Sequence, residues 1–288
     1  MYRFSGRRAI LGTVCAAVCL SCIAATPTFG ASVDVSAASA SRYDRRVLAD
    51  DPSAYWTMGN PSTGRETDLS GSRHNGRYGV NPGRATLPNR EIAADFNGTT
   101  QYFEAADAAG LSPATKGVLT IEAWMRPDTL SFPTAGTNGY VHWMGKGKPG
   151  AHEYVSRMYS QPNTVDRGNR ISGYLFNAAG GLGAGSYFQD RVVAGQWIHY
   201  VLVINTTKKS AAFPNGYTKI YRDGVLRDQD NLFIDGRAVV PTRGTAPFRV
   251  GTRDFGSYFE GAIGKVAIYD SELSVSDITA HYRLMTGK

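Results

Sequence analysis

The residues best suited to contact a ligand are concentrated in one polar and aromatic stretch, residues 140–189. Aromatic rings stack on the C–H faces of sugars, while guanidinium, amide and carboxylate groups hydrogen-bond to sugar hydroxyls. If the stretch forms central strands of a sheet, alternate side chains line one surface. We therefore predict a ligand groove there. The candidate ligand-binding residues are His142, His152, Glu153, Arg157, Tyr159, Arg170, Tyr174, Asn177 and Gln189.

Residues 153–159 show how a strand would present these groups. Glu153, Arg157 and Tyr159 have the same parity, so the period-two alternation of a strand predicts that they share a face. A structural interpretation stands beside the functional one. Strand aromatics are commonly part of a core, and Arg157 could pair with Glu153 instead of with a ligand.

The elements that would position these residues are short strands. From residue 53 onward, apolar or alternating segments are separated by Gly, Pro, Asn and Asp. This pattern indicates a β-sandwich or barrel, not a βαβ fold. The predicted strands are Ala54–Thr57, Ala93–Phe96, Gln101–Glu104, Val118–Met125, Tyr140–Met144, Tyr154–Tyr159, Arg170–Phe176, Trp197–Asn205, Thr218–Arg222, Phe248–Gly251 and Ala262–Tyr269.

Turn and helix signals complete this scheme. Asp223-Gly224 between apolar runs predicts a tight hairpin, and Asn97-Gly98 predicts a second. At the C-terminus, Ser274 and Asp277 form an S-x-x-D capping box before an apolar face at positions 278, 282 and 285. We expect one short C-terminal helix against the sandwich. Residues 41–52 are predicted to be a short lead-in strand or arm, and 53–288 a single domain.

The first 40 residues have the anatomy of an export signal. Arginines at positions 3, 7 and 8 precede an apolar run over 9–25, and Ala38-Ser39-Ala40 fits an A-x-A cleavage site. The paired arginines are compatible with a twin-arginine signal or with the general secretory route. The run is too short for a convincing membrane span. We therefore expect a secreted, extracellular protein with no membrane span in the mature chain.

Composition narrows the chemistry of the mature chain. All three cysteines, at 15, 19 and 22, lie in the predicted signal, so we expect no disulfide or thiolate site. Removing residues 1–40 takes away three arginines and one acid, leaving 28 basic and 23 acidic residues, a net charge of +5. These charges are spread along the chain without a basic block, so we expect no nucleic-acid partner.

The order of several motifs resembles the laminin-G-like domain of the concanavalin A-like lectin/glucanase superfamily, in its secreted bacterial form. The resemblance covers about residues 50–285. The motifs that carry it are Ala54-Tyr55-Trp56-Thr57-Met58, Asp68-Leu69-Ser70-Gly71 with Asn75-Gly76, Ala94-Asp95-Phe96-Asn97-Gly98, Leu119-Thr120-Ile121-Glu122-Ala123-Trp124, Gln196-Trp197-Ile198-His199, Ile220-Tyr221-Arg222-Asp223-Gly224 and Phe259–Tyr269.

The resemblance implies an all-β fold, a two-sheet antiparallel jelly-roll sandwich. It also implies a structural Ca²⁺, for which Asp68 and Asn75 are the candidate ligands. However, the closing motif reads Ile263-Gly264-Lys265-Val266 where related domains carry acids. The alternative is that Asp68 only holds its loop as an Asx turn.

Catalytic patterns of related enzymes do not match this sequence. The alternating carboxylates of the β-glucanases are missing, because Glu122, Glu153 and Glu260 are isolated. Gln196 and His199 are three apart, whereas the Q-x-H pattern of alginate lyases places both on one strand face. Neither a Ser/His/Asp order nor H-E-x-x-H occurs.

The sequence therefore favours a secreted, non-catalytic carbohydrate-binding module that recognises an extracellular glycan. The first alternative is a polysaccharide hydrolase or lyase that uses an unrecognised site around His152, Arg157 and Tyr159. The second is a protein-interaction or adhesion module of the cell surface, which would present an apolar surface patch.

Overall fold

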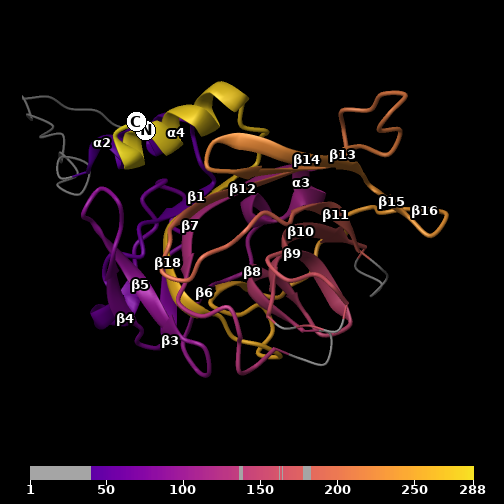
Figure 1. Cartoon of the computed structure of the whole chain (residues 1–288). Helices are drawn as coiled ribbons and strands as arrows, with labels where there is room; N and C mark the ends of the chain where they lie inside the picture. Colours follow the sequence, from indigo (N-terminus) through magenta and orange to yellow (C-terminus); the bar gives the residue numbers. More distant parts are fainter. Residues whose placement is uncertain (1–39, 136–138, 162, 164, 178–182) are drawn as a thin grey trace, which may run out of the picture. The chain divides into compact units, whose positions relative to one another are not determined.

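The computed structural model describes residues 40–135, 139–161, 163, 165–177 and 183–288. Apart from Ala40, the predicted export signal lies outside these residues. Strands dominate, and they form two antiparallel sheets that pack into a jelly-roll sandwich (Figure 1). The predicted fold class is therefore confirmed. Within the described part of the chain, none of the helices is long and apolar enough to span a membrane.

The first sheet, sheet A, contains eight strands. Its central strand β7 lies between β12 and β18, and β1 pairs with β18 beside the main path. In sheet order, the strands are β14 (Val225–Asn231), β13 (Tyr217–Arg222), β12 (Ile198–Asn205), β7 (Val118–Pro127), β18 (Glu260–Tyr269), β5 (Ile92–Asn97) and β4 (Gly83–Thr86), with β1 at Ala54–Trp56.

The second sheet, sheet B, also contains eight strands. In sheet order, they are β11 (Gly183–Phe188), β10 (Ile171–Phe176), β9 (Ala151–Tyr159), β8 (Tyr140–Lys148), β17 (Phe248–Val250), β6 (Tyr102–Ala105), β3 (Gly76–Val80) and β2 (Arg65–Glu66). A small hairpin, β15 (Phe233–Ile234) with β16 (Arg237–Ala238), stands apart from both sheets.

The main core lies between the two sheets. Alternate side chains of β7, including Leu119 and Ile121, face it and are fully buried. From sheet B, the Trp143 ring meets the Tyr200 ring of sheet A edge to face at 4.8 Å. Full burial of each large apolar side chain is worth about 1.5–3 kcal/mol. The alternate residues of β8 to β11 consequently point away from this core.

The outer face of sheet A is covered by two helices, α2 (Arg42–Ala49) and α4 (Val275–Thr286), which lie side by side (Figure 1). A third, one-turn helix is α3 (Pro113–Lys116). As predicted, Ser274 caps α4 by accepting from the backbone N–H of Asp277. The helices explain why all residues of β12 are buried, since the strand has the core on one side and helices on the other.

Beneath these helices, Glu122 of β7 is fully buried in a polar cluster. Tyr43 Oη donates to its Oε1 at 2.8 Å, and His199 Nε2 lies 2.8 Å from the same oxygen. Tyr269 Oη donates to Oε2 at 3.2 Å, and His281 Nδ1 lies 2.9 Å from it. This carboxylate therefore joins two strands to both covering helices. It is a structural group, and His199 is buried with it.

Two local predictions were wrong. Residues 42–49 form helix α2, not a strand or arm, because Ser41 and Asp44 make a reciprocal capping box and Tyr43 and Val47 bury one face. Asn97-Gly98 does not close a hairpin, because β5 belongs to sheet A and β6 to sheet B. It turns the chain from one sheet to the other. By contrast, Asp223-Gly224 does join β13 to β14, with positive φ at both residues.

Candidate functional site

The outer face of sheet B, on β8 to β11, carries most of the predicted ligand-binding side chains. The strand registers place His142, Arg157, Ser172 and Tyr187 side by side in one row across the four strands. Tyr140 and Tyr159 pair in the adjacent row. We call this surface the Tyr–Arg face. Its residues are Tyr140, His142, His152, Arg157, Tyr159, Arg170, Ser172, Tyr174, Phe176 and Tyr187.

Arg157 lies at the centre of the Tyr–Arg face. Its guanidinium carbon is 4.5 Å from the centroid of the Tyr140 ring, 4.3 Å from Tyr174 and 5.1 Å from Tyr159. Its Nε donates to Ser172 Oγ at 3.4 Å. Cation–π contacts of this kind hold the side chain in place. Across the described residues, Arg157 has no acidic partner, so the alternative in which it pairs with Glu153 does not hold.

Tyr159 separates Arg157 from a second arginine. The tyrosine is almost fully buried, and its hydroxyl accepts from Arg167 Nη1 at 2.9 Å. The guanidinium carbon of Arg167 is 5.6 Å from the same ring. The Tyr159 ring therefore lies between two guanidinium groups, those of Arg157 and Arg167.

Arg170 and Tyr187 form the other side of the face. The Arg170 guanidinium carbon is 3.9 Å from the centroid of the Tyr187 ring. Arg170 also donates from Nε and Nη2 to Gln189 Oε1, at 2.9 and 2.7 Å. Gln189 in turn donates to the carbonyl of Asp166 at 3.0 Å. Gln189 thus fixes Arg170, and the ring of Tyr187 remains 40% exposed.

The two histidines of the face are neutral near pH 7. Burial, with the positive charges of Arg253 and Arg157, lowers the pKa of His142 to about 2 against the opposing effect of Asp254. Burial and Arg253 also lower the pKa of His152. The His152 ring meets the Phe176 ring edge to face at 5.3 Å. Neutral rings of this kind can accept or donate one hydrogen bond each.

Glu153 does not belong to the Tyr–Arg face, and its predicted position there was wrong. The pairing of β8 with β9 shifts between Lys146 and Gly147, which breaks the simple alternation before Tyr154. The Glu153 carboxylate is buried and ion-paired with Lys146. It also accepts from Ser112 Oγ at 2.6 Å and from the Gly244 N–H at 2.9 Å. It is a structural group at the end of the sandwich.

Asn177 directly follows β10 and adjoins residues 178–182, which lie outside the described chain. The structure places it at the end of the strand that carries Ser172 and Tyr174. Its role in ligand binding stays a prediction.

Asp68 and Asn75 hold a loop. Asp68 Oδ1 accepts from the N–H groups of Tyr55 and Ser70, both at 2.9 Å, and Oδ2 accepts from the His74 N–H at 2.8 Å. Asn75 Oδ1 accepts from the Asp68 N–H at 2.9 Å. Calcium prefers six to eight oxygen ligands, and no group of three or more metal-binding side chains occurs among the described residues. This donor set does not fit a calcium ion.

A basic residue occupies the place where the calcium motif usually carries acids. Lys265 is buried, and its Nζ lies 2.6 Å from Asp44 Oδ1 and 3.1 Å from Glu91 Oε2. Burial alone would raise the pKa of Asp44, but the charge of Lys265, together with the hydrogen bonds from Lys265, Tyr55 and Ser41, outweighs it and lowers that pKa. The altered motif therefore anchors helix α2 on sheet A.

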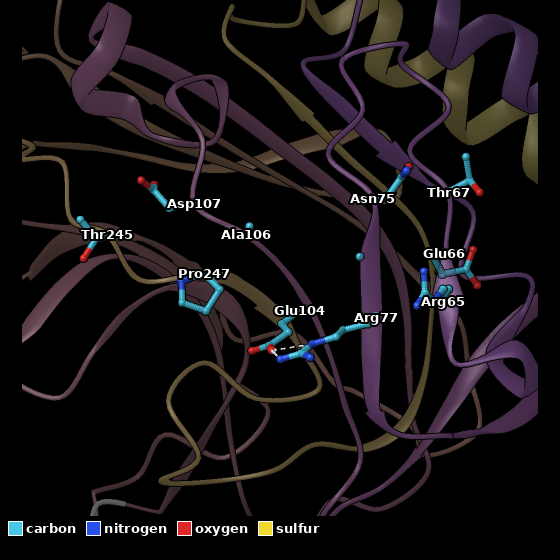
Figure 2. Close-up of a pocket in the computed structure, with 11 residues that line it drawn as sticks. Arg65, Glu66, Thr67, Asn75, Arg77, Glu104, Ala106, Asp107, Thr245 and Pro247 are labelled. Carbon is cyan, nitrogen blue, oxygen red and sulfur yellow. Dashed lines mark hydrogen bonds and ion pairs between the residues drawn. The ribbon is translucent and has the colours of Figure 1, made fainter.

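A separate pocket of about 770 Å³ lies at the edge of sheet B (Figure 2). Figure 2 shows Arg77 reaching Glu104, to which its Nη2 donates at 2.8 Å. Asn75 lines this pocket, but no aromatic ring does among the described residues. Its lining residues are Arg65, Glu66, Thr67, Asn75, Gly76, Arg77, Glu104, Ala106, Asp107, Thr245 and Pro247.

The sequence prediction missed several contributors to the Tyr–Arg face. Tyr140 and Tyr187 lie in the predicted stretch but were not singled out, although their strand parity with His142 and Gln189 could have indicated them. The sequence position of Arg253 gave no sign that it lies near this face, because it reaches the face from the loop after β17. It is ion-paired with Asp254, and its Cγ would lie 3.4 Å from a Cβ at Gly145.

The two-sheet architecture is that of a concanavalin A-like β-sandwich domain. Residues 97–279 match the family model of the concanavalin A-like lectin/glucanases superfamily. The chain belongs to this superfamily, as its motif order predicted. A comparison with curated protein sequences finds no match.

Solved structures share the fold at low sequence identity. Domain 4 of AbnA, a GH43 extracellular arabinanase from Geobacillus stearothermophilus in complex with arabinotriose, is 19% identical with a TM-score of 0.53, over 81% of this chain and 98% of that one. The botulinum neurotoxin serotype D ligand binding domain in complex with N-acetylneuraminic acid is 13% identical with a TM-score of 0.56, over 82% of this chain and 52% of that one.

The receptor binding domain of the botulinum neurotoxin C/D mosaic serotype is also similar. It is 13% identical with a TM-score of 0.56, over 81% of this chain and 51% of that one. The chain thus spans about half the length of these two toxin structures. At these identities the likeness establishes the fold alone, and such folds host many functions.

Proposed function

We propose that this chain is a secreted, non-catalytic carbohydrate-binding module that binds an extracellular glycan through the Tyr–Arg face. The observation that carries the proposal is Arg157, which is held among three tyrosine rings while no carboxylate of the described residues neutralises it. Beside it, Tyr187 is 40% exposed, and the ring face that Arg170 does not cover offers a surface on which a sugar ring can stack. The sugar-bound structures among the fold's relatives support the same class of ligand.

Binding is favoured over glycoside hydrolysis because of the charges on this face. Hydrolysis commonly needs two carboxyl groups on either side of the scissile bond. None of the ten residues of the Tyr–Arg face is acidic. Asp254 lies close by, but it is ion-paired with the buried Arg253, and Glu153 is committed to Lys146.

A glycan array with the purified protein tests the proposal, followed by titration calorimetry on the best ligand. Tyr187→Ala removes the stacking ring and should weaken binding about tenfold, whereas Tyr187→Phe keeps the ring and should bind nearly as well. If both variants bound the ligand as tightly as the unchanged protein, Tyr187 would not be part of the site. A protein partner in pull-downs, with no glycan signal, would instead support an adhesion module.

A lyase is the second candidate, and the pairing of His142 with Arg157 across β8 and β9 favours it. A lyase that acts on a uronate removes a proton beside a carboxylate. Arg157 could neutralise that carboxylate, but His142, with its pKa lowered to about 2, would be a weak base for the proton, so this candidate ranks below binding. The ultraviolet absorbance of unsaturated uronate products separates the candidates. Turnover that Arg157→Ala abolishes would replace the binding proposal.

The extracellular location in this proposal rests on the signal anatomy of residues 1–40. Expression of the full-length chain in a bacterial host, followed by N-terminal sequencing of the protein in the medium, tests it. We expect a mature N-terminus close to Ser41. Retention of the uncleaved chain inside the cell would contradict this part of the proposal.

A further inference from the structure

Positive charge gathers on one part of the Tyr–Arg face without matching negative charge. Arg157, Arg167 and Arg170 come from β9 and the segment that joins it to β10. Each contacts a tyrosine ring, and none forms an ion pair with a described residue. Elsewhere arginines do find acids, for example Arg249 with Glu104 at 3.1 Å. The face is therefore suited to an anion that the chain itself does not supply.

The surroundings of Arg157 limit how that anion can approach. Tyr140 lies toward one end of the strands and Tyr174 toward the other, because they belong to the rows on either side of the Arg157 row. Ser172 takes the Nε hydrogen. The N–H groups of the terminal nitrogens Nη1 and Nη2 of Arg157 donate to no described residue. Such a pair of N–H groups matches a planar carboxylate in a two-point hydrogen bond.

Next to Arg157 the same row of the face carries a small side chain and then an exposed aromatic residue. Ser172 is small and fully buried, and it separates Arg157 from Tyr187 in the same row. Because neighbouring strands lie about 4.8 Å apart, the backbones of Arg157 and Tyr187 are roughly 10 Å apart. A glycan that extends from Arg157 to Tyr187 would thus meet a guanidinium at one end and an exposed aromatic residue at the other.

We propose that the glycan bound by this protein is acidic, and that Arg157 binds the carboxylate of its uronic acid residues while Tyr187 stacks on a sugar ring. This inference rests on the proposed glycan binding and names its ligand class. Arg167 and Arg170 flank the site and add a longer-range attraction for a polyanion. The tyrosines around Arg157 keep it extended and partly desolvated, so that the side chain loses little freedom on binding.

The test compares polymers that share a backbone and differ in the carboxylate. Polygalacturonate and its carboxyl-reduced form are titrated into the purified full chain, with hyaluronan, alginate and dextran sulfate in parallel. We expect at least one uronate polymer to bind, and removal of its carboxylates to weaken binding tenfold or more. Salt should weaken the binding further, because part of it is electrostatic.

Variants assign the effect to Arg157. Arg157→Ala should lose tenfold or more in affinity for the uronate polymer. Arg157→Lys should recover little, because an ammonium lacks the planar pair of donors. The matched control is Arg84→Ala, which removes an exposed arginine of β4 in sheet A. Circular dichroism and thermal unfolding establish that each variant is folded.

The outcomes separate this inference from the proposed function. Equal binding of the native and carboxyl-reduced polymers would leave glycan binding in place and overturn the carboxylate assignment. Equal binding of dextran sulfate and the uronates, or equal losses in Arg157→Ala and Arg84→Ala, would reduce the interaction to general attraction by a basic surface and also overturn it. Binding of no glycan on the array would overturn both proposals.

Discussion

The buried carboxylate of Glu122 provides a sharp test of how this sandwich holds its covering helices. In Glu122→Gln, the side chain keeps its size but loses its charge and exchanges one acceptor oxygen for an NH₂ donor. The oxygens now accept from Tyr43 and Tyr269 and contact both His199 and His281. The amide of the variant has a single oxygen, so it can accept hydrogen bonds only from the groups at one of the two carboxylate oxygens. The groups at the other oxygen would then face an NH₂ donor in a fully buried site.

The expected cost follows from those contacts. A hydrogen bond to a charged group contributes about 1.5–3 kcal/mol, and breaking a buried ion pair on one side costs about 3–5 kcal/mol. Because His281 can lose its proton in the variant, the two costs do not simply add. We expect a loss of about 3–5 kcal/mol in the free energy of unfolding at neutral pH.

Urea unfolding followed by tryptophan fluorescence measures this loss. Trp124 is a suitable probe, because its ring stacks on His199 at 5.0 Å within the cluster. The midpoint should fall by about 1–2 M urea. The control is Glu260→Gln, on the same sheet, whose carboxylate makes no hydrogen bond or ion pair among the described residues. It should change stability by less than about 0.5 kcal/mol. A loss below about 1 kcal/mol for Glu122→Gln would refute the reasoning.

Three further predictions concern the same scaffold. Burial alone would raise the pKa of Glu122, but the charges and hydrogen bonds of His281 and His199 together outweigh it and lower that pKa. The stabilisation is therefore complete above about pH 4.3 and lost as the pH falls through the lowered value, so Glu122→Gln should flatten the acid side of a melting-temperature profile. Lys265→Met leaves Asp44 buried without its partner and should cost about 3–5 kcal/mol, with faster amide exchange throughout α2. Asp68→Ala should cost about 2–4 kcal/mol, because three N–H groups lose their acceptor, whereas a chelator should leave the melting temperature unchanged. A chelator-induced drop would restore the calcium prediction.

The strand pattern was predictable because burial imposes it on the sequence. In β7, Leu119 and Ile121 alternate with Thr120 and Glu122, and each set faces a different layer. All the strands predicted from such patterns are present in the structure. The strands β2, β15 and β16 were missed because two residues carry no periodicity, and the longer strands β3, β4, β11 and β14 were also missed because they are rich in glycine or polar residues. Helix α2 was missed although its capping box was visible at Ser41 and Asp44. Half of its eight residues are charged, so its few apolar residues give no clear helical pattern.

The candidate site was only partly predictable, because bulges and loops decide it. Period-two alternation correctly grouped Arg157 with Tyr159, since β9 is regular there. It failed for Glu153, where the register shift redirects the side chain toward Lys146. Nothing in the local sequence indicates such a bulge. Likewise, the loop residue Arg253 is about a hundred positions from the strands it covers, and only the folded chain brings it there.

The side-by-side packing of α2 and α4 has a practical consequence for handling the protein. Both helices lie on the outer face of sheet A, so the chain enters and leaves the described domain on the side opposite the Tyr–Arg face. A linker, affinity tag or surface anchor attached after α4 would therefore leave the Tyr–Arg face pointing outward. On a biosensor chip, immobilisation through a C-terminal tag should preserve full ligand capacity, whereas random coupling through surface lysines would orient the molecules in many directions.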